Sequence, residues 1–245
     1  MSFSPQEVER YARHLVIKEI GGPGQMKLRA ARVVVVGAGG LGAPCLLYLA
    51  AAGVGTIVIV DDDVVSLSNL QRQIIHNGEA IGQPKVHSAA SVLSSINDTV
   101  QIVPVANRMS RDNATDLLAD ADVVVDGSDS FETRQVIAEV CEQVQAPMVT
   151  AAVSVWDGSL TVIAPHMSLA DGRLAPSFGD IYPAAPEPGS LPTCAEAGVV
   201  GALTGTMGTM QAMEVVKLIT GAGEPLIGRV LLVDALTMRF ETLEV

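Results

Sequence analysis

A glycine-rich turn between an apolar run and a helical segment constrains this sequence more than any other feature. The hexapeptide 37–42 has the pattern GxGxxG, formed by Gly37, Gly39 and Gly42, with Gly40 as a further glycine inside it. It directly follows the apolar run Val33–Val36 and leads into a predicted helix over Leu41–Ala52. Glycines permit a tight turn and let the backbone approach a phosphate, which a helix N-terminus attracts. The pattern therefore predicts a nucleotide site after a central strand.

Short apolar runs alternate with helical segments through the first 150 residues. Further strands are predicted at Thr56–Val60, Val100–Ala106, Val123–Asp126 and Met148–Ala152, with helices at Lys85–Ile96, 112–119 and Thr133–Gln143. Strands that alternate with helices indicate an α/β protein with a doubly wound, mostly parallel, Rossmann-like sheet. The stretch Val33–Val60 contains no charged residue, but its glycines and the buried character of parallel strands argue against a membrane span.

The pattern changes after about residue 153. Asp157-Gly158 between two apolar segments predicts a tight antiparallel hairpin, and residues 230–243 predict a second one. Residues 165–192 read as a long loop before a helix over 195–219. We interpret 1–245 as a single domain, with a nucleotide-binding part at about 30–152 and an antiparallel, partner-binding extension at about 153–245.

Charge and cysteine content exclude several classes of function. The chain has 15 Lys and Arg against 27 Asp and Glu, a net charge of −12. Such a chain repels nucleic acids and anionic membranes, so neither is expected as a partner. Three cysteines without a CxxC pair and a polar N-terminus without a signal peptide indicate a cytoplasmic protein.

Four charged side chains extend the nucleotide signal. Asp61 ends the strand after the glycine turn, where a carboxylate accepts hydrogen bonds from ribose hydroxyls. Arg72 and Lys85 are two of the few cations in the first half of the chain, and Asp129 follows a parallel strand. The turn and the acid alone also suit an NAD-dependent oxidoreductase. A triphosphate needs in addition cations and a carboxylate for Mg²⁺, and these residues supply them.

The order of five segments resembles one family. GAGGLGAP, DDDVVSLSNLQRQ, GQPKV, DGSDSFETR and TCAEAGV are similar to segments of the bacterial MoeB/ThiF adenylyltransferases, relatives of ubiquitin-activating E1 enzymes. The resemblance implies an E1-like fold and ATP-dependent adenylylation. The substrate it implies is the C-terminal glycine carboxylate of a ubiquitin-like sulfur carrier that ends in Gly-Gly, with release of pyrophosphate.

The resemblance also implies roles for individual residues. The glycine turn and Asp61 would hold the nucleoside, and Lys85 and Asp129 would serve the phosphates and Mg²⁺. The segment that matches the family's nucleotide-binding sequence consists of Ser68, Asn69, Leu70, Gln71 and Arg72. Arg13 matches an arginine that reaches the neighbouring subunit's site, which implies a homodimer.

Cys194 corresponds to a family cysteine that in some members links covalently to the carrier, and it directly precedes the predicted helix 195–219. Many members also bind a structural zinc through two CxxC pairs. Here Ser177 and Asp180 stand at the first pair's positions, and the chain ends at Val245 before the second pair. We therefore expect no structural zinc.

The identity of the carrier stays open in the sequence. The segments SNLQRQ and TCAEAGV favour the molybdopterin branch, while a thiamine-pathway or other sulfur carrier is the alternative. A nucleotide-regulated scaffold without catalysis is a further alternative, although the three charged residues Arg72, Lys85 and Asp129 argue against it. No sulfurtransferase-like segment occurs in the chain, so a separate sulfur donor is expected.

Overall fold

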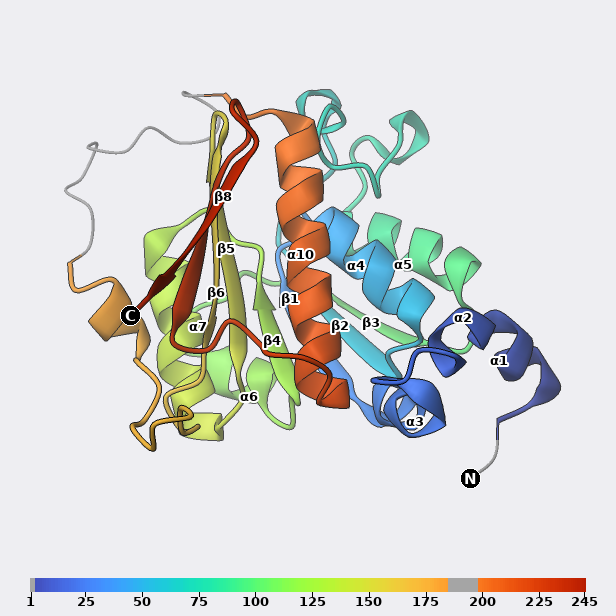
Figure 1. Cartoon of the computed structure of the whole chain (residues 1–245). Helices are drawn as coiled ribbons and strands as arrows, with labels where there is room; N and C mark the ends of the chain where they lie inside the picture. The colour runs from blue at the N-terminus through green and yellow to red at the C-terminus, as the bar shows by residue number, and fades with distance from the viewer. Residues whose placement is uncertain (1–2, 185–197) are drawn as a thin grey trace.

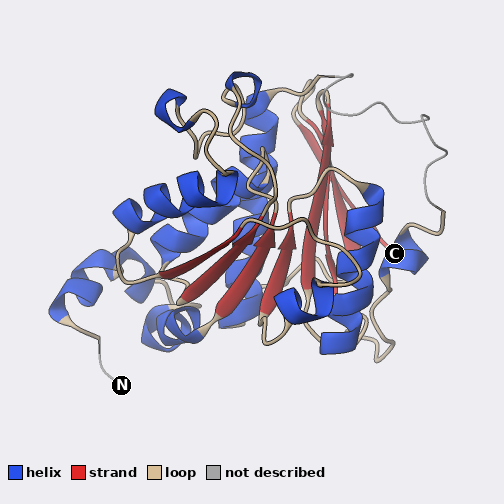
Figure 2. Cartoon of the chain, turned by 180° about the vertical axis from the view of Figure 1, so that it is seen from behind, coloured by secondary structure: helices blue, strands red, loops and turns tan. Residues whose placement is uncertain are grey.

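The strands form one mixed sheet that runs through the whole molecule. The structure, a computed structural model, describes residues 3–184 and 198–245. The strand order is β3-β2-β1-β4-β5-β6-β7-β8. The first five strands pair in parallel and the last three antiparallel, which confirms the predicted fold class (Figure 2). The bounds are β1 Arg32–Val36, β2 Thr56–Val60, β3 Gln101–Val105, β4 Val123–Asp126, β5 Met148–Ser154, β6 Asp157–Ile163, β7 Arg229–Asp234 and β8 Arg239–Glu244.

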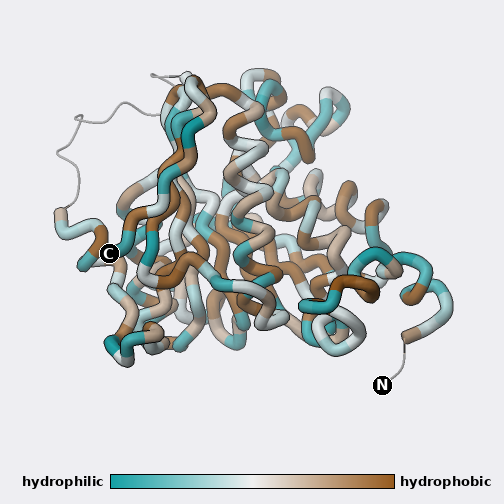
Figure 3. Tube along the Cα trace, in the orientation of Figure 1, coloured by the Kyte–Doolittle hydropathy of each residue, from teal (hydrophilic) through white to brown (hydrophobic). Residues whose placement is uncertain are grey.

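Helices cover both faces of this sheet (Figure 1). One face carries α3 Gly21–Ala30, α4 Gly42–Ala52, α5 Lys85–Ile96 and α10 Gly201–Thr220, and the other carries α6 Ala114–Leu118, α7 Phe131–Val144 and α8 Phe178–Ile181. The remaining elements are α1 Pro5–Arg10, α2 Ala12–Leu15, and the 3-10 turns η1 Leu67–Asn69 and η2 Gly78–Ala80. Figure 3 shows hydrophobic stretches in the strands and in the helices that cover them.

Burial on both faces explains the continuous apolar runs in the sequence. In β1, Val33 and Val35 pack into the core below α4 and α10, whereas Val34 and Val36 pack into the core below α6 and α7. Because successive side chains of a strand point to opposite faces, each residue of a covered strand needs an apolar side chain.

The sheet order reverses between β1 and β4. From β1 the chain builds outward to β2 and β3, and from β4 it continues in the other direction to β5. Ligands bind in open α/β sheets at such a reversal, beyond the carboxyl ends of the strands. The fold therefore places a crevice where β1 and β4 end.

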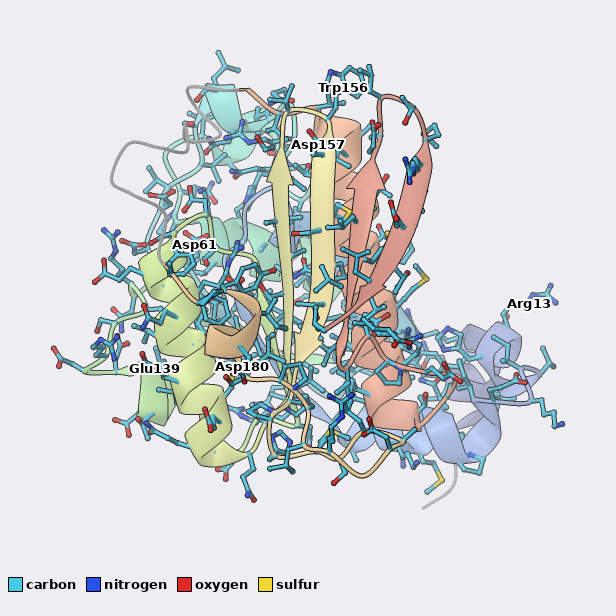
Figure 4. The ribbon with its side chains drawn as sticks, turned by 60° about the vertical axis from the view of Figure 1, so that its left-hand side comes forward. Arg13, Asp61, Glu139, Trp156, Asp157 and Asp180 are labelled. Carbon is cyan, nitrogen blue, oxygen red and sulfur yellow. The ribbon has the colours of Figure 1, made fainter. Side chains whose placement is uncertain are left out.

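The first hairpin differs from the prediction. Ser154 pairs with Asp157, so the turn is Val155-Trp156, with Val155 at φ 47°, and Asp157-Gly158 belongs to β6 (Figure 4). Gly158 lies against α10, where an added Cβ would meet the Sδ atom of Met207 at 2.9 Å. The glycine thus serves close packing of helix on strand, and the expected Asp-Gly turn was wrong.

One helix boundary also differs from the prediction. The helix expected over 195–219 begins at Gly201, after Val199 forms a bridge with Val155. Cys194 lies outside the described residues.

Two of the three cysteines lie in the core, as predicted. Cys45 in α4 and Cys141 in α7 are buried and free. Burial raises the pKa of both thiols, so they are unreactive at neutral pH. Within residues 3–184 and 198–245, no helix is long and apolar enough to cross a membrane.

Candidate functional site

The glycine turn closes the space between β1 and β4. Gly37 adopts φ 97°, and an added Cβ there would lie 2.7 Å from the carbonyl oxygen of Gly127. A Cβ on Gly42 would lie 1.8 Å from the carbonyl oxygen of Gly37. These two glycines are therefore required by the turn itself, and only glycine fits at either position.

The middle of the turn offers free backbone donors. No acceptor in the described part of the chain takes the N–H groups of Gly39 and Gly40, which precede α4. Both residues line a cavity of about 1100 Å³ at the carboxyl ends of β1 and β4. Unpaired N–H groups at a helix N-terminus attract an anion, and phosphate is the group that such a turn suits.

Asp61 connects the turn to the end of β2. Its Oδ2 accepts the N–H of Ala38 at 2.8 Å and its Oδ1 accepts the N–H of Asp63 at 2.8 Å. Each carboxylate oxygen keeps further lone pairs that can accept hydroxyl hydrogens. The expected ribose-binding carboxylate is therefore held rigidly at the cavity wall.

The three charged residues predicted from the sequence line the same cavity. Arg72 donates from Nη1 to the carbonyl oxygen of Ser68 at 3.1 Å. Lys85 is buried, with its Nζ 2.7 Å from Oδ2 of the exposed Asp63. Asp129 is exposed in the lining and has no hydrogen-bond or ion-pair partner among the described residues. The cavity thus brings two cations and an unpaired carboxylate to the glycine turn.

Residues 68–71 do not line the cavity but support the residue that follows them, Arg72, which does. The carbonyl oxygen of Asn69 accepts the N–H groups of Arg72 and Gln73, and the backbone of Gln71 packs against Gly201. Leu70 is half-buried and Ser68 is exposed. These residues form the turn that aims Arg72, so their direct contact with a nucleotide stays a prediction.

Two other predicted residues lie away from the cavity. Gly42 is buried in the turn, and Arg13 is exposed on α2, far from Asp61 (Figure 4). An arginine at this position cannot serve the site of its own subunit. Its predicted role in a neighbouring subunit's site therefore requires a second copy of the chain.

Gln73 was not predicted as a site residue from the sequence. This side chain lines the cavity, is 4% exposed, and its Oε1 has no partner among the described residues. Its Nε2 lies 3.7 Å from where a Cβ of Gly39 would be. A buried amide oxygen without a partner carries a desolvation cost, which a ligand donor in the cavity would remove.

A buried ion pair near Asp129 was also not predicted from the sequence. Asp126 is fully buried at the end of β4, and its Oδ2 lies 2.9 Å from Nε of Arg134 in α7. Its carboxylate also accepts from Oγ1 of Thr150 at 2.6 Å and from the N–H of Ser128 at 3.0 Å. The signal was present, because Asp126 and Arg134 begin and end the segment DGSDSFETR.

The place of the expected zinc ligands has a different structure. Ser177 caps α8, and its Oγ donates to Oδ2 of Asp180 at 2.7 Å. The ring of Phe178 in this helix packs at a tilt against those of Phe131 and Tyr182, with ring centroids 5.5 and 5.0 Å apart. No group of three or more His, Cys, Asp or Glu that could bind a metal occurs in the described ranges. Absence of zinc from the protein stays a prediction.

Comparison with known proteins gives one consistent family. The model of the ThiF family matches residues 11–245. The chain is 46% identical to the SAMP-activating enzyme E1 of Haloferax volcanii over 242 residues, which cover 99% of the chain and 87% of that enzyme. It is 40% identical to the sulfur carrier protein adenylyltransferase of Thermus thermophilus, covering 100% of the chain and 90% of that enzyme.

Longer relatives also match the chain in sequence, and solved structures match its fold. The chain is 44% identical to the probable adenylyltransferase/sulfurtransferase MoeZ of Mycobacterium tuberculosis. The match covers 100% of the chain and 62% of that protein. The fold resembles that of PaaA, with a TM-score of 0.81, 24% identity, and coverage of 99% of the chain and 74% of PaaA. It also resembles Escherichia coli MccB with ATP, with a TM-score of 0.79, 19% identity, and coverage of 96% and 71%.

Proposed function

The chain belongs to the ThiF family, and on that premise we propose that it is an ATP-dependent adenylyltransferase of a ubiquitin-like sulfur-carrier protein. Relatives of 46% and 40% identity carry the names SAMP-activating enzyme E1 and sulfur carrier protein adenylyltransferase. The observation that carries the proposal is the single cavity in which Arg72, Lys85 and Asp129 meet the glycine turn and Asp61.

The reaction follows from the groups that meet there. A carboxylate oxygen at the carrier's C-terminal glycine attacks the α-phosphorus of ATP, and the bond from this phosphorus to the bridging oxygen breaks. The products are the acyl-adenylate and pyrophosphate. The nucleophile is already ionised at pH 7, so the protein needs no general base. The catalytic problem is the repulsion between a carboxylate and a polyphosphate.

Arg72 and Lys85 address this repulsion. Of the four cations in the cavity lining, Lys85 pairs with Asp63 and Arg134 pairs with Asp126. Arg72 and Arg108 form no ion pair in the described part of the chain, so their charge is free for the ligand. We assign Arg72 to the charge that develops on the phosphates and Lys85 to a fixed position beside them.

Asp129 fits a magnesium ion that arrives with ATP. Mg²⁺ usually binds through one or two carboxylates and the phosphates of its substrate. Asp129 has an unpaired carboxylate in the cavity lining, on the turn that Ser128 ties to Asp126. The ion supplies further neutralisation of phosphate charge.

The finer assignments extend this proposal. Cys194 as a covalent link to the carrier, a homodimer that shares Arg13 between sites, a separate sulfur donor and a cytoplasmic location are all proposed on the family pattern. For the carrier we favour the molybdopterin branch, with a thiamine-pathway carrier as the alternative. An NAD-dependent oxidoreductase is disfavoured, because Arg72, Lys85 and Asp129 would have no task in it.

The magnesium role predicts the behaviour of Asp129→Asn. This variant keeps the size and polarity of the side chain but loses its charge. We expect carrier-dependent ATP–pyrophosphate exchange to fall by about 100-fold or more, with partial recovery at high Mg²⁺. Asp98→Asn, which changes an exposed carboxylate between α5 and the amino end of β3, is the matched control. Exchange by Asp129→Asn at the wild-type rate would remove Asp129 from the site.

A further inference from the structure

His76 is a buried side chain to which the proposed reaction gives no task. It follows the segment that carries Arg72 and is 6% exposed. Its Nε2 lies 3.0 Å from the carbonyl oxygen of Ala38, in the middle of the glycine turn. Its Nδ1 lies 2.9 Å from Oγ of Ser88 in α5. The ring therefore joins the turn to a helix on the same face of the sheet.

The two partners fix the tautomer of His76. A carbonyl oxygen can only accept a hydrogen bond, so Nε2 carries the hydrogen and donates it to Ala38. Nδ1 then accepts the hydroxyl hydrogen of Ser88. Burial lowers the pKa of His76 and outweighs the hydrogen bond to Ala38, which acts in the opposite direction. The imidazole is therefore neutral at pH 7.

The bond to Ala38 orients a neighbouring donor. The carbonyl of Ala38 and the N–H of Gly39 belong to one peptide group, and the described chain has no cis peptide bond. In a trans peptide these two groups point in opposite directions. The N–H of Gly39 is thus directed away from His76. The N–H of Ala38 is held by Asp61 from the other side of the residue.

The glycine at position 39 makes the hydrogen bond from His76 to the Ala38 carbonyl necessary. Gly39 has no Cβ, so the peptide that precedes it turns over more easily than in front of another residue. Without a partner on the carbonyl oxygen, the N–H of Gly39 would sample both directions. A donor that is fixed before the ligand binds costs less entropy at binding.

We propose that His76 is a positioning residue that holds the Ala38–Gly39 peptide so that the N–H of Gly39 donates to a phosphate of the bound nucleotide. This role rests on the proposed nucleotide site. In this proposal the hydrogen-bonded chain Ser88–His76–Ala38 supports phosphate binding, and Asp61 binds the nucleoside.

The test compares ligands with and without phosphate. His76→Leu removes the hydrogen bond at similar volume, and His76→Gln restores a donor near the position of Nε2. For the full chain we expect His76→Leu to weaken ATP binding about ten-fold and adenosine binding less than two-fold, with His76→Gln near wild type. Ser88→Ala, which only unties the ring, should weaken ATP binding two- to three-fold. His87→Leu, an exposed histidine of α5, is the control.

The outcomes separate the role of His76 from the nucleotide site itself. Equal losses of ATP and adenosine affinity in His76→Leu indicate a purely structural role and overturn the proposal, as does unchanged ATP affinity. If His76→Leu does not fold, unchanged ATP affinity in Ser88→Ala or a large loss in His76→Gln overturns it. Failure of the wild-type protein to bind ATP overturns the nucleotide site as well. If the wild-type protein binds ATP and His76→Leu and Ser88→Ala bind it equally well, the role of His76 is overturned but the nucleotide site stands.

Discussion

Arg72→Ala is expected to lower carrier-dependent ATP–pyrophosphate exchange by a factor of about 100 to 1000, the range seen when one preorganised charge-stabilising donor is removed. Arg72 lines the cavity without an ion-pair partner among the described residues, so its whole charge is available to the phosphates and is lost in the variant. Within the described residues its guanidinium makes a single hydrogen bond, to the carbonyl of Ser68, and this bond contributes little to the fold. The variant should therefore melt close to the wild-type temperature.

The control for this loss is an arginine outside the cavity. Arg111 forms an exposed ion pair with Glu139, and Arg111→Ala should leave both exchange and the melting temperature close to wild type. Arg72→Lys should regain part of the activity, because the charge is kept and the planar donor geometry is lost. Exchange by folded Arg72→Ala within a few-fold of wild type would contradict the assignment.

Asp126→Ala is expected to destabilise the protein by about 3–5 kcal/mol, because it leaves the guanidinium of Arg134 without its carboxylate in a buried position. The hydroxyl of Thr150 and the N–H of Ser128 lose their acceptor as well. For a chain of this length, such a loss lowers the melting temperature by about 10 °C. Differential scanning calorimetry measures it.

The contrast with an exposed pair makes the prediction specific. Asp98→Ala removes the partner of Arg10 at a site where Asp98 is 72% exposed, and it should cost less than about 1 kcal/mol. Equal stabilities of the two variants would show that the buried pair does not hold the end of β4. Since Ser128 precedes Asp129 on that turn, Asp126→Ala should also raise the Mg²⁺ concentration needed for exchange.

The sequence predicted the parallel half of the fold well. Strands β1, β2 and β4 match the expected bounds within one residue, because strands covered on both faces leave uninterrupted apolar runs. The glycine turn and the end of the next strand are equally local signals. They were sufficient to place Gly39, Gly40 and Asp61 at one cavity.

Features that depend on contacts distant in sequence were not predicted. Asp157-Gly158 carries the usual signal of a turn, but residue 158 is a glycine because the side chain of Met207 in α10 leaves no room for a Cβ there. His76, Gln73 and Asp126 look ordinary in the sequence. Their roles depend on Ala38, Gly39 and Arg134, which only the folded chain brings near them. Local sequence patterns therefore located the candidate site, whereas the buried residues that support it depend on tertiary contacts.

Carrier-dependent ATP–pyrophosphate exchange tests the central claim most directly. The full chain is assayed with Mg²⁺ against a panel of ubiquitin-like sulfur carriers that end in Gly-Gly, and against the same carriers without the last glycine. We expect exchange with at least one intact carrier, none with the shortened forms, and no binding of NAD. ATP binding without exchange for any carrier would favour a scaffold, and NAD binding in place of ATP would contradict the account.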